Sequence, residues 1–381
     1  MRIVLFANTE WYLYNFRRAL ALALKSAGHE VILLSPDGEW GARLRELGLD
    51  WRPFPLSRRG MNPFAELLTV RRLARLYGQL QPDLVHHFTI KCVIYGSLAS
   101  HVARVPHIVN SITGLGHMML SRSLVARMLR PFILGLYRLS LRGTDVIFQN
   151  RDNAELFERY GLLAQARRHL VPGSGLDFSR FDSAPPRRDQ PPVILMVGRL
   201  LWAKGVSDYV DAARIVRQRF PEVEFWLAGE ADTHTPDCIP EAQIAIWRRE
   251  GHVKFLGHRN DIAALNARCS IAVLASRDGE GLPRSLLEAA ASARAIVATN
   301  VPGSRDVFVN GMGGLLVPPS NPAALADAVA GLLADPVRLE EMGQAARVYS
   351  AERFSDARII ATTLSIYGIA DDDGAPSPVS V

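Results

Sequence analysis

A regular alternation of short apolar runs with segments of helical period constrains the fold most. RIVLFAN (2–8) precedes a helical pattern from Asn15 to Gly28, and HEVILLSP (29–36) follows it. Short apolar runs bounded by turn residues are typical of fully buried strands, and helices between such strands indicate a parallel sheet. The same pattern predicts strands at 83–88, 107–113 and 145–150.

A segment rich in Pro, Gly and Ser, 173–192, interrupts this alternation, and a second series follows it. We therefore predict an α/β chain with two Rossmann-like domains, 1–172 and 193–355, each built on a parallel sheet, with 173–192 as the linker. A helix at 356–370 could return to the first domain, and the tail, 371–381, is expected to be disordered. Strands are predicted within 192–200, 224–230, 253–257, 271–276, 295–300 and 314–319, and helices over 206–220, 322–334 and roughly 336–367.

Length and cysteine content favour a two-domain cytosolic protein. The chain has 381 residues, of which 48% are hydrophobic, so it can bury a large core. Cys92, Cys238 and Cys269 lie far apart without metal-ligand spacing, which indicates reduced thiols. We expect neither a signal peptide nor a spanning helix, because no apolar run approaches about 18 residues.

The charge is distributed unevenly along the chain. Residues 1–172 contain 23 Lys and Arg against 12 Asp and Glu, a balance of +11, while the remainder carries 21 against 26, a balance of −5. A basic half favours an anionic partner such as a phosphate-bearing ligand, a nucleic acid or a membrane surface. An uneven but solvated surface is the alternative.

The stretch EGLPRSLLE places two carboxylates, Glu280 and Glu288, around a turn and the helix that follows it. It comes directly after a predicted strand, and Pro283 suits the first helical position. Ligands of open α/β sheets bind beyond the carboxyl ends of strands, where free N–H groups of a helix attract phosphate. Acidic residues are also common near helix starts for electrostatic reasons alone, so the stretch by itself leaves function open.

Two cations follow a strand of the same half. VGRLLWAKG carries Arg199 and Lys204 at the end of the predicted strand that begins near residue 192. Cations at this edge suit a diphosphate that must be held and then released. A solvated basic turn is the alternative interpretation.

Several motifs together resemble a known family. VGRL…KG, FLGHR.DI, EGLPRSLLEA and VPGSRDV…GLLVPP look like the C-terminal half of retaining GT-B glycosyltransferases of family 4, in which EGLPRSLLE matches the E-x7-E motif. NTEWYLYNFR, LSRRGMNP, HHFTIKCVIYGSLA and TGLGH resemble the branch with capsule and O-antigen transferases and with bacterial transferases that extend undecaprenyl-diphosphate-linked glycans.

The resemblance implies a role for each motif. Arg199 and Lys204 would neutralise the diphosphate of a UDP-sugar as the glycosidic bond breaks, Glu288 would hold the ribose, and Glu280 would contact hydroxyls of the transferred sugar. It implies a GT-B fold, in which the parallel sheets of the two Rossmann-like domains face each other across a cleft. It also implies retention of configuration by a front-face route, with no divalent metal and no cofactor beyond the donor. The remaining donor contacts would be Gly198, Gly281, Leu282 and Pro283.

One position departs from the family pattern. Many members have a His after the fourth predicted strand of the first half, where this chain has Thr113, and His117 comes four residues later. His117 is a catalytic candidate, although an ordinary loop histidine explains it equally well. His86 and His87 stand at the end of the third strand of the first half, and we expect one of them to pack and the other to face the cleft.

A basic amphipathic stretch, SRSLVARMLRPFILGLYRLSLR (121–142), predicts contact with an anionic membrane. Arg127 and Arg130 fall on its basic side, Phe132 and Leu136 on its apolar side, and Pro131 is expected to kink or split the helix. A core-packing helix with a solvated basic face is the alternative.

The acceptor implied by the resemblance is a polyprenyl-diphosphate-linked glycan. Arg58, Arg59 and Lys91 are candidates for its diphosphate, and Trp11 and Tyr12, with Tyr14, for an aromatic platform under an acceptor sugar, unless these rings are core residues. The expected enzyme is a UDP-sugar-dependent hexosyl or N-acetylhexosaminyl transferase, peripheral at the inner face of the bacterial plasma membrane.

Other functions remain open at this point. A nucleotide-sugar epimerase or hydrolase of the same fold is the main alternative, and a non-catalytic nucleotide-sugar-binding protein is a weaker one. We expect no nucleic-acid partner, despite the pI near 9.4, because no ribonucleoprotein, zinc-finger or helix-turn-helix signature is present.

Overall fold

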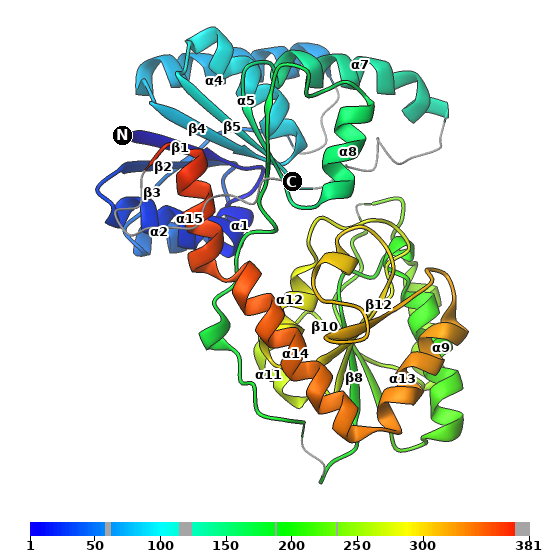
Figure 1. Cartoon of the computed structure of the whole chain (residues 1–381). Helices are drawn as coiled ribbons and strands as arrows, with labels where there is room; N and C mark the ends of the chain where they lie inside the picture. The colour runs from blue at the N-terminus through cyan, green and yellow to red at the C-terminus, as the bar shows by residue number, and fades with distance from the viewer. Residues whose placement is uncertain (58–61, 114–123, 187–188, 234, 370–381) are drawn as a thin grey trace. The chain divides into compact units, whose positions relative to one another are not determined.

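The computed structural model describes residues 1–57, 62–113, 124–186, 189–233 and 235–369. It divides into two compact units (Figure 1). Unit 1 comprises Met1–Gly175 together with Asp356–Val381, and unit 2 comprises Leu176–Ser355. The expected tail lies outside the described residues.

Unit 1 contains a seven-stranded parallel sheet of order β3-β2-β1-β4-β5-β6-β7. The edge strands β3 and β7 escaped prediction because DWRP and RRHL are short and polar, and an edge strand needs no continuous apolar run. The strands are β1 (Arg2–Phe6), β2 (Glu30–Ser35), β3 (Asp50–Pro53), β4 (Leu84–Phe88), β5 (His107–Ile112), β6 (Asp145–Phe148) and β7 (Arg167–Leu170).

The first helical region begins at Glu10, five residues before the predicted start. The Thr9 hydroxyl caps it by accepting a hydrogen bond from the Tyr12 N–H, and a π-helical turn, η1 (Leu13–Arg17), separates α1 from α2. The helices of unit 1 are α1 (Glu10–Tyr12), α2 (Arg18–Ser26), α3 (Trp40–Glu46), α4 (Pro63–Leu80), α5 (Ile90–Ala103), α7 (Leu124–Ser140), α8 (Arg151–Arg159) and α15 (Asp356–Ile366).

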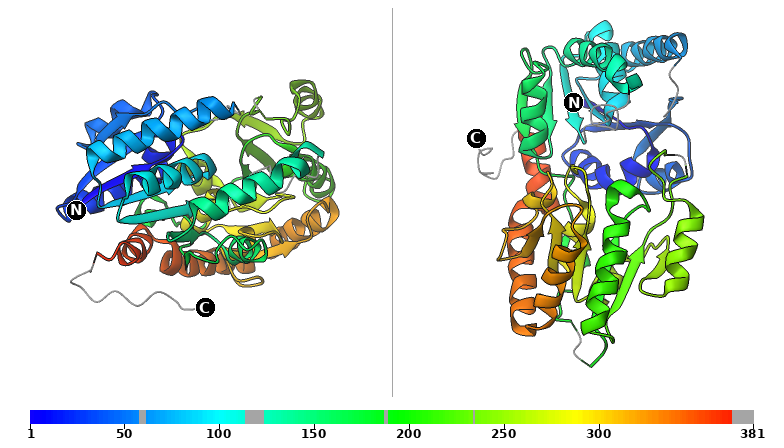
Figure 2. Two further views of the ribbon diagram at one scale, coloured as in Figure 1. Left: turned by 90° about the horizontal axis from the view of Figure 1, so that it is seen from above. Right: turned by 90° about the vertical axis from the view of Figure 1, so that its right-hand side faces the viewer.

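Helices cover both faces of this sheet, as right-handed crossovers between parallel strands require. Helices α4, α5 and α7 lie side by side on one face, with α5 in the middle (Figures 1 and 2). Helices α2 and α15 pack on the other face with the β1 and β2 side chains. Helix α15 therefore belongs to unit 1, although it directly follows the last helix of unit 2.

Unit 2 contains a six-stranded parallel sheet of order β10-β9-β8-β11-β12-β13. All six strands predicted for this half are present, so the α/β class and the parallel sheets are confirmed. The strands are β8 (Val193–Val197), β9 (Glu224–Ala228), β10 (Lys254–Gly257), β11 (Ile271–Leu274), β12 (Ala295–Thr299) and β13 (Gly314–Val317). The helices are α9 (Val206–Arg219), α10 (Glu241–Glu250), α11 (Ile262–Arg268), α12 (Arg284–Ala291), α13 (Pro322–Leu333) and α14 (Pro336–Phe354), with a 3-10 turn, η3 (Trp202–Lys204).

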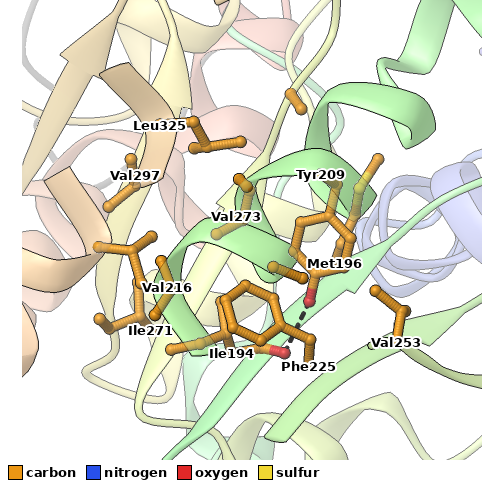
Figure 3. Packing of buried hydrophobic residues seen from close by; sticks show 14 of the residues in the cluster. Ile194, Met196, Tyr209, Val216, Phe225, Val253, Ile271, Val273, Val297 and Leu325 are labelled. Atoms are coloured by element: carbon orange, nitrogen blue, oxygen red, sulfur yellow. Dashed lines mark hydrogen bonds between the residues drawn. The ribbon is translucent and has the colours of Figure 1, made fainter. Parts of the chain in front are cut away.

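Tyr209 organises the core beneath one face of this sheet (Figure 3). The side chain is fully buried, and its hydroxyl donates to the carbonyl oxygen of Ile194 at 2.7 Å. Burial raises the pKa of this phenol well above its ordinary value. The bond ties α9 to β8, the two elements that flank the loop carrying Arg199 and Lys204.

Most of the predicted linker is a packed segment of unit 2. Leu176 bridges to Ser355 and donates its N–H to the carbonyl of Phe354 at 3.0 Å. Phe178 and Phe181 pack against the core of unit 2. These apolar side chains bind the segment to the domain that follows, whereas its Pro and Gly content alone indicated a free connection. The helical pattern at 336–367 is likewise two helices, α14 and α15, separated at Ser355.

Within the described ranges, no helix is both long and apolar enough to cross a membrane.

Candidate functional site

The sequence motifs of unit 2 meet at the carboxyl edge of its sheet. Arg199 and Lys204 follow β8, Glu280 follows β11, and Pro302 and Gly303 follow β12. Since β8, β11 and β12 are neighbours in a parallel sheet, their carboxyl ends lie together. Ligands of open α/β sheets bind at this edge.

Lys204 and Glu280 form an ion pair at this edge. The Lys204 ammonium donates to Oε1 of Glu280, and the Ser276 hydroxyl donates to the same oxygen at 2.6 Å. Both side chains are mostly buried, with 22% and 17% exposed. The Glu280 N–H also donates to the Pro302 carbonyl at 2.9 Å, so side chain and backbone of Glu280 are both held.

Two glycines allow the loops to approach this closely. Gly205, directly after Lys204, has φ +68°, and a Cβ there would overlap the carbonyl oxygen of Ala275. Gly303 has φ +83° and would clash with the backbone of Glu280 and Gly281. Left-handed backbone and absent side chains thus bring the loops after β8 and β12 against the loop after β11.

Arg277 anchors the Glu280 loop, and the sequence motifs did not point to it. Its guanidinium forms a bidentate pair with the buried Asp208 of α9, at 2.6 and 3.0 Å, and contacts the Ser207 hydroxyl at 2.9 Å. Its N–H donates to the Ala203 carbonyl at 2.8 Å. Arg277 therefore joins the loop after β11 to the turn that carries Lys204. Only the RDGEG context marks it, and any exposed loop arginine looks the same in sequence.

Helix α12 starts at Arg284, so the prediction that Pro283 is its first residue is wrong. Pro283 is the N-cap, with an extended ψ of 111°. Glu288 lies on this helix, 16% exposed, and accepts a hydrogen bond from Nε of Arg284 at 3.0 Å. Burial raises the pKa of Glu288, while Arg284 and Arg180 act in the opposite direction.

The remaining predicted donor residues lie in the loops after β8 and β11, next to Lys204 and Glu280 in the chain. Arg199 is 61% exposed in its side chain and pairs with Asp232 at 2.9 Å. Gly198 continues the β8 ladder, its N–H donating to Ala228 at 3.0 Å, and Gly229 packs directly on the Gly198 carbonyl. Gly281 is in the turn after Glu280, and Leu282 packs on the core of unit 2.

The acceptor candidates of unit 1 are only partly available. Lys91 pairs with Glu66 of α4 at 2.7 Å and donates to the Ser57 carbonyl at 2.9 Å, so it joins α5 to α4 rather than standing free. Trp11 is 45% exposed, whereas the Tyr12 hydroxyl accepts from the buried Arg17 at 2.9 Å. The Tyr14 ring packs against Trp40 in a tilted arrangement, with a centroid distance of 4.9 Å. Of the proposed aromatic platform, Trp11 is the most exposed ring.

His86 and His87 are both buried, so the expectation that one of them faces the cleft is wrong. His86 contacts the hydroxyls of Ser111 and of Tyr367, the residue after α15. His87 contacts Asn110 at 3.0 Å, and desolvation lowers its pKa to about 4. Arg58, Arg59 and His117, and the side chain of Arg127, lie outside the described residues.

Helix α7 runs through Pro131 without a split, and its apolar residues face in two directions. Leu136 lies against the core beside Tyr137, whereas Phe132 is 66% exposed. Met128 is 82% exposed, and Arg130 is half-buried. The predicted single apolar face is therefore shared between the core and the surface, because the helix packs on α5.

No group of three or more potential metal ligands occurs among the residues that the structure describes.

Comparisons with known proteins agree with this architecture. Residues 2–151 match the family described as glycosyl transferase 4-like, and residues 191–335 match glycosyl transferases group 1. The N,N'-diacetylbacillosaminyl-diphospho-undecaprenol alpha-1,3-N-acetylgalactosaminyltransferase of Campylobacter jejuni is 30% identical over 348 residues, covering 88% of this chain and 90% of that protein.

Solved structures share the fold of the whole chain. HepE of Anabaena, in complex with UDP and glucose, has a TM-score of 0.78 at 22% identity and covers 96% of this chain and 99% of its own. Sucrose-phosphate synthase of Thermosynechococcus elongatus has a TM-score of 0.76 at 18% identity, covering 97% and 98%. The chain therefore has the GT-B fold and is a glycosyltransferase. Its first half belongs to the glycosyl transferase 4-like family, and its second half belongs to the glycosyl transferases of group 1.

Proposed function

We propose that this glycosyltransferase moves a hexose or N-acetylhexosamine from a UDP-sugar to a polyprenyl-diphosphate-linked glycan, with retention of configuration, in the assembly of a bacterial surface polysaccharide or glycoprotein glycan. The similarity to the Campylobacter jejuni transferase over 88% of the chain carries this proposal. That protein's name specifies an undecaprenyl-diphosphate-linked sugar as acceptor. HepE, which binds UDP and glucose, agrees with a UDP-sugar donor.

The unit 2 site has the charges that such a donor needs. Arg199 and Lys204 each already hold a carboxylate, Asp232 and Glu280, so the site keeps two cations at the sheet edge. We infer that the donor diphosphate replaces these carboxylates as partner of the two cations. The cations then stabilise the charge that grows on the diphosphate as the glycosidic bond breaks.

The same exchange would free Glu280 for the sugar. The Ser276 hydroxyl would still donate to its carboxylate, and the Glu280 N–H would still donate to the Pro302 carbonyl. The carboxylate would then accept hydrogen bonds from hydroxyls of the transferred sugar. Glu288 on α12 would accept both hydroxyls of the ribose. In the front-face route, the leaving phosphate oxygen takes the acceptor's proton, and no protein nucleophile or metal takes part.

The acceptor would approach from a membrane. We propose peripheral attachment at the inner face of the bacterial plasma membrane, with exposed Phe132 and Met128 of α7 in the interface and Arg130 near it. Arg58, Arg59 and Lys91 would serve the acceptor diphosphate, and Trp11 its sugar.

A ligand screen without metal tests the donor assignment. UDP and one or a few UDP-sugars should raise the Tm of the purified protein, whereas GDP, dTDP and ADP should not. Glu288→Ala should lose the shift, and Glu241→Ala, a change of an exposed carboxylate on α10, should keep it. Equal shifts for all nucleotides, or none, would contradict the UDP assignment.

Product analysis then tests the transfer. Incubation with the selected UDP-sugar and a polyprenyl-diphosphate-linked acceptor should yield an α-linked product from an α-linked donor. Release of free sugar at the same rate with and without acceptor would instead identify a hydrolase.

A further inference from the structure

The outward face of α4 exposes three large apolar side chains close together. Phe64, Leu67 and Leu68 are 84%, 50% and 44% exposed, although they lie in the first two turns of an otherwise ordinary amphipathic helix. Its opposite side packs into the core through the buried Leu73 and Tyr77. A helix that covers a sheet normally turns polar side chains outward, so three large apolar residues in this place require another explanation.

An arginine row continues this apolar patch along the same face. Arg71, Arg72 and Arg75 are exposed and lie about two to three turns after Phe64. At 3.6 residues per turn, the six positions fall within an arc of about 140°. The single acidic residue of α4, Glu66, is on the inner side and is neutralised by Lys91. The outward face therefore combines an apolar end with a basic row and carries no carboxylate.

Helix α7, on the other side of α5, also exposes a large apolar side chain. Both α4 and α7 pack against α5, and Met128 on α7 is exposed to nearly the same extent as Phe64. Helices that connect parallel strands run from the carboxyl edge of the sheet to its amino edge. Phe64 and Met128, near the starts of their helices, thus both lie toward the carboxyl edge of the unit 1 sheet.

We propose that the outward face of α4 docks on an anionic lipid bilayer, with Phe64, Leu67 and Leu68 among the acyl chains and Arg71, Arg72 and Arg75 on the lipid phosphates. Anionic lipids complement a basic row that has no acidic neighbour, and a bilayer accepts apolar side chains without a shaped pocket. The arrangement places the carboxyl edge of unit 1, where ligands of such sheets bind, at the membrane surface. The inference extends the proposed function, but lipid binding can be measured whether or not that function is correct.

Sedimentation with vesicles tests the docking. The full chain should bind vesicles of phosphatidylglycerol and phosphatidylcholine, and bind phosphatidylcholine alone weakly. Phe64→Ser/Leu67→Ser/Leu68→Ser and Arg71→Glu/Arg72→Glu/Arg75→Glu should each lower the partition coefficient by at least about tenfold. Circular dichroism and Tm should stay near those of the wild type, because all six side chains point away from the core.

Matched variants in unit 2 test whether vesicle binding depends on the α4 face itself or only on the net charge and exposed apolar area of the whole protein. Val337→Ser/Val348→Ser/Ile246→Ser removes the same number of exposed apolar residues, and Arg219→Glu/Arg248→Glu/Arg249→Glu changes the charge by the same amount. Both should bind vesicles nearly as the wild type does. If these controls lose as much binding as the α4 variants, or if the wild type binds no vesicles, the proposal is wrong.

A fluorescence measurement places α4 in the bilayer. A polarity-sensitive dye on Leu68→Cys, in a Cys238→Ser background, should shift to the blue on anionic vesicles, and the same dye on Val337→Cys should not; Cys92 and Cys269 are buried. No shift at residue 68 would overturn insertion. Light scattering without lipid tests whether the face instead binds a second copy of the chain. If the wild type is an oligomer and the α4 variants are monomers, the face binds a second copy.

Transfer assays distinguish this proposal from the function itself. With a short-chain, water-soluble acceptor the α4 variants should keep the wild-type kcat and KM. With a long-chain acceptor in vesicles, the apparent KM should rise. Activity lost equally with both acceptors would mean that α4 acts on catalysis rather than on membrane docking.

Discussion

The ammonium of Lys204 donates to the carboxylate of Glu280, although 76 residues separate them in the chain. Ser276 donates to the same oxygen at 2.6 Å, so the carboxylate has a cationic and a neutral donor on one atom. Loss of the cation therefore affects two proposed functions at once, neutralisation of the diphosphate and the placement of Glu280.

Lys204→Ala should lower kcat by roughly 10²- to 10³-fold, as removal of one preorganised donor does in other active sites. The fold should persist, because Ser276 and the Pro302 carbonyl still hold Glu280. Steady-state kinetics with circular dichroism checks this, and Arg248→Ala, on the exposed face of α10, is the control. Wild-type turnover in Lys204→Ala would remove this residue from the site.

The raised pKa of Glu288 predicts that donor binding depends on pH. Burial raises its pKa above the ordinary 4.5, and the ribose hydroxyls need the ionised form. The affinity for UDP should therefore fall as the pH drops through this raised pKa and level off above it. Calorimetry at several pH values should show this trend, and Glu288→Gln should bind weakly at every pH.

The raised pKa of Glu288 also affects the folding stability, in the direction opposite to its effect on donor affinity. A carboxyl whose pKa is higher in the folded state opposes folding when it is ionised, so Glu288→Gln should leave Tm at neutral pH unchanged or raise it. A large drop in Tm together with lost binding would mean that Glu288 is structural.

A substitution of Arg277 should lower kcat while leaving UDP binding intact. Arg277→Ala removes the bidentate pair with Asp208 that anchors the Glu280 loop, while Arg199 and Glu288 keep their places. We expect kcat to fall about tenfold or more, with the UDP-induced rise in Tm retained. Arg277→Lys should restore part of kcat, and Arg259→Ala, an exposed pair with Asp261, should change nothing. Equal loss of binding and turnover would assign Arg277 to folding alone.

Asp145 should make unit 1 sensitive to acid. Burial alone would raise its pKa, but hydrogen bonds from Arg167, His107 and His169 outweigh burial and hold the pKa well below the ordinary value. The stabilisation is therefore fully present above the ordinary pKa of 3.8 and is lost progressively as the pH falls below that value.

Asp145→Asn should cost about 3 kcal/mol of unfolding free energy at neutral pH, because three donors lose a buried carboxylate. It should also flatten the acid limb of the stability curve. Denaturant titrations at several pH values measure both effects. Asp50→Asn, whose partner Arg52 is exposed, is the control and should cost less than about 1 kcal/mol. Similar losses for the two variants would contradict the role of burial.

The periodicity of the chain was enough to predict every strand of unit 2 and five of the seven strands of unit 1. β3 and β7 escaped prediction because edge strands such as DWRP carry no continuous apolar signal. The linker was misassigned for the reverse reason, since Phe178 and Phe181 pack on a core that a Pro-rich composition does not reveal. Glu280 and Glu288 can be named as candidates from the sequence because their spacing around a strand, a turn and a helix is local.

The amino-acid sequence by itself determined most strands along the chain, the parallel type of the sheets and the loops after the strands, since each depends on patterns within a few turns of chain. Only the tertiary structure decided that Lys204 holds Glu280, that Arg277 holds Asp208, and that Phe64 points to solvent while Leu73 on the same helix is buried. These relations depend on distances between residues far apart in the chain. Packing determines those distances, and no local periodicity records them.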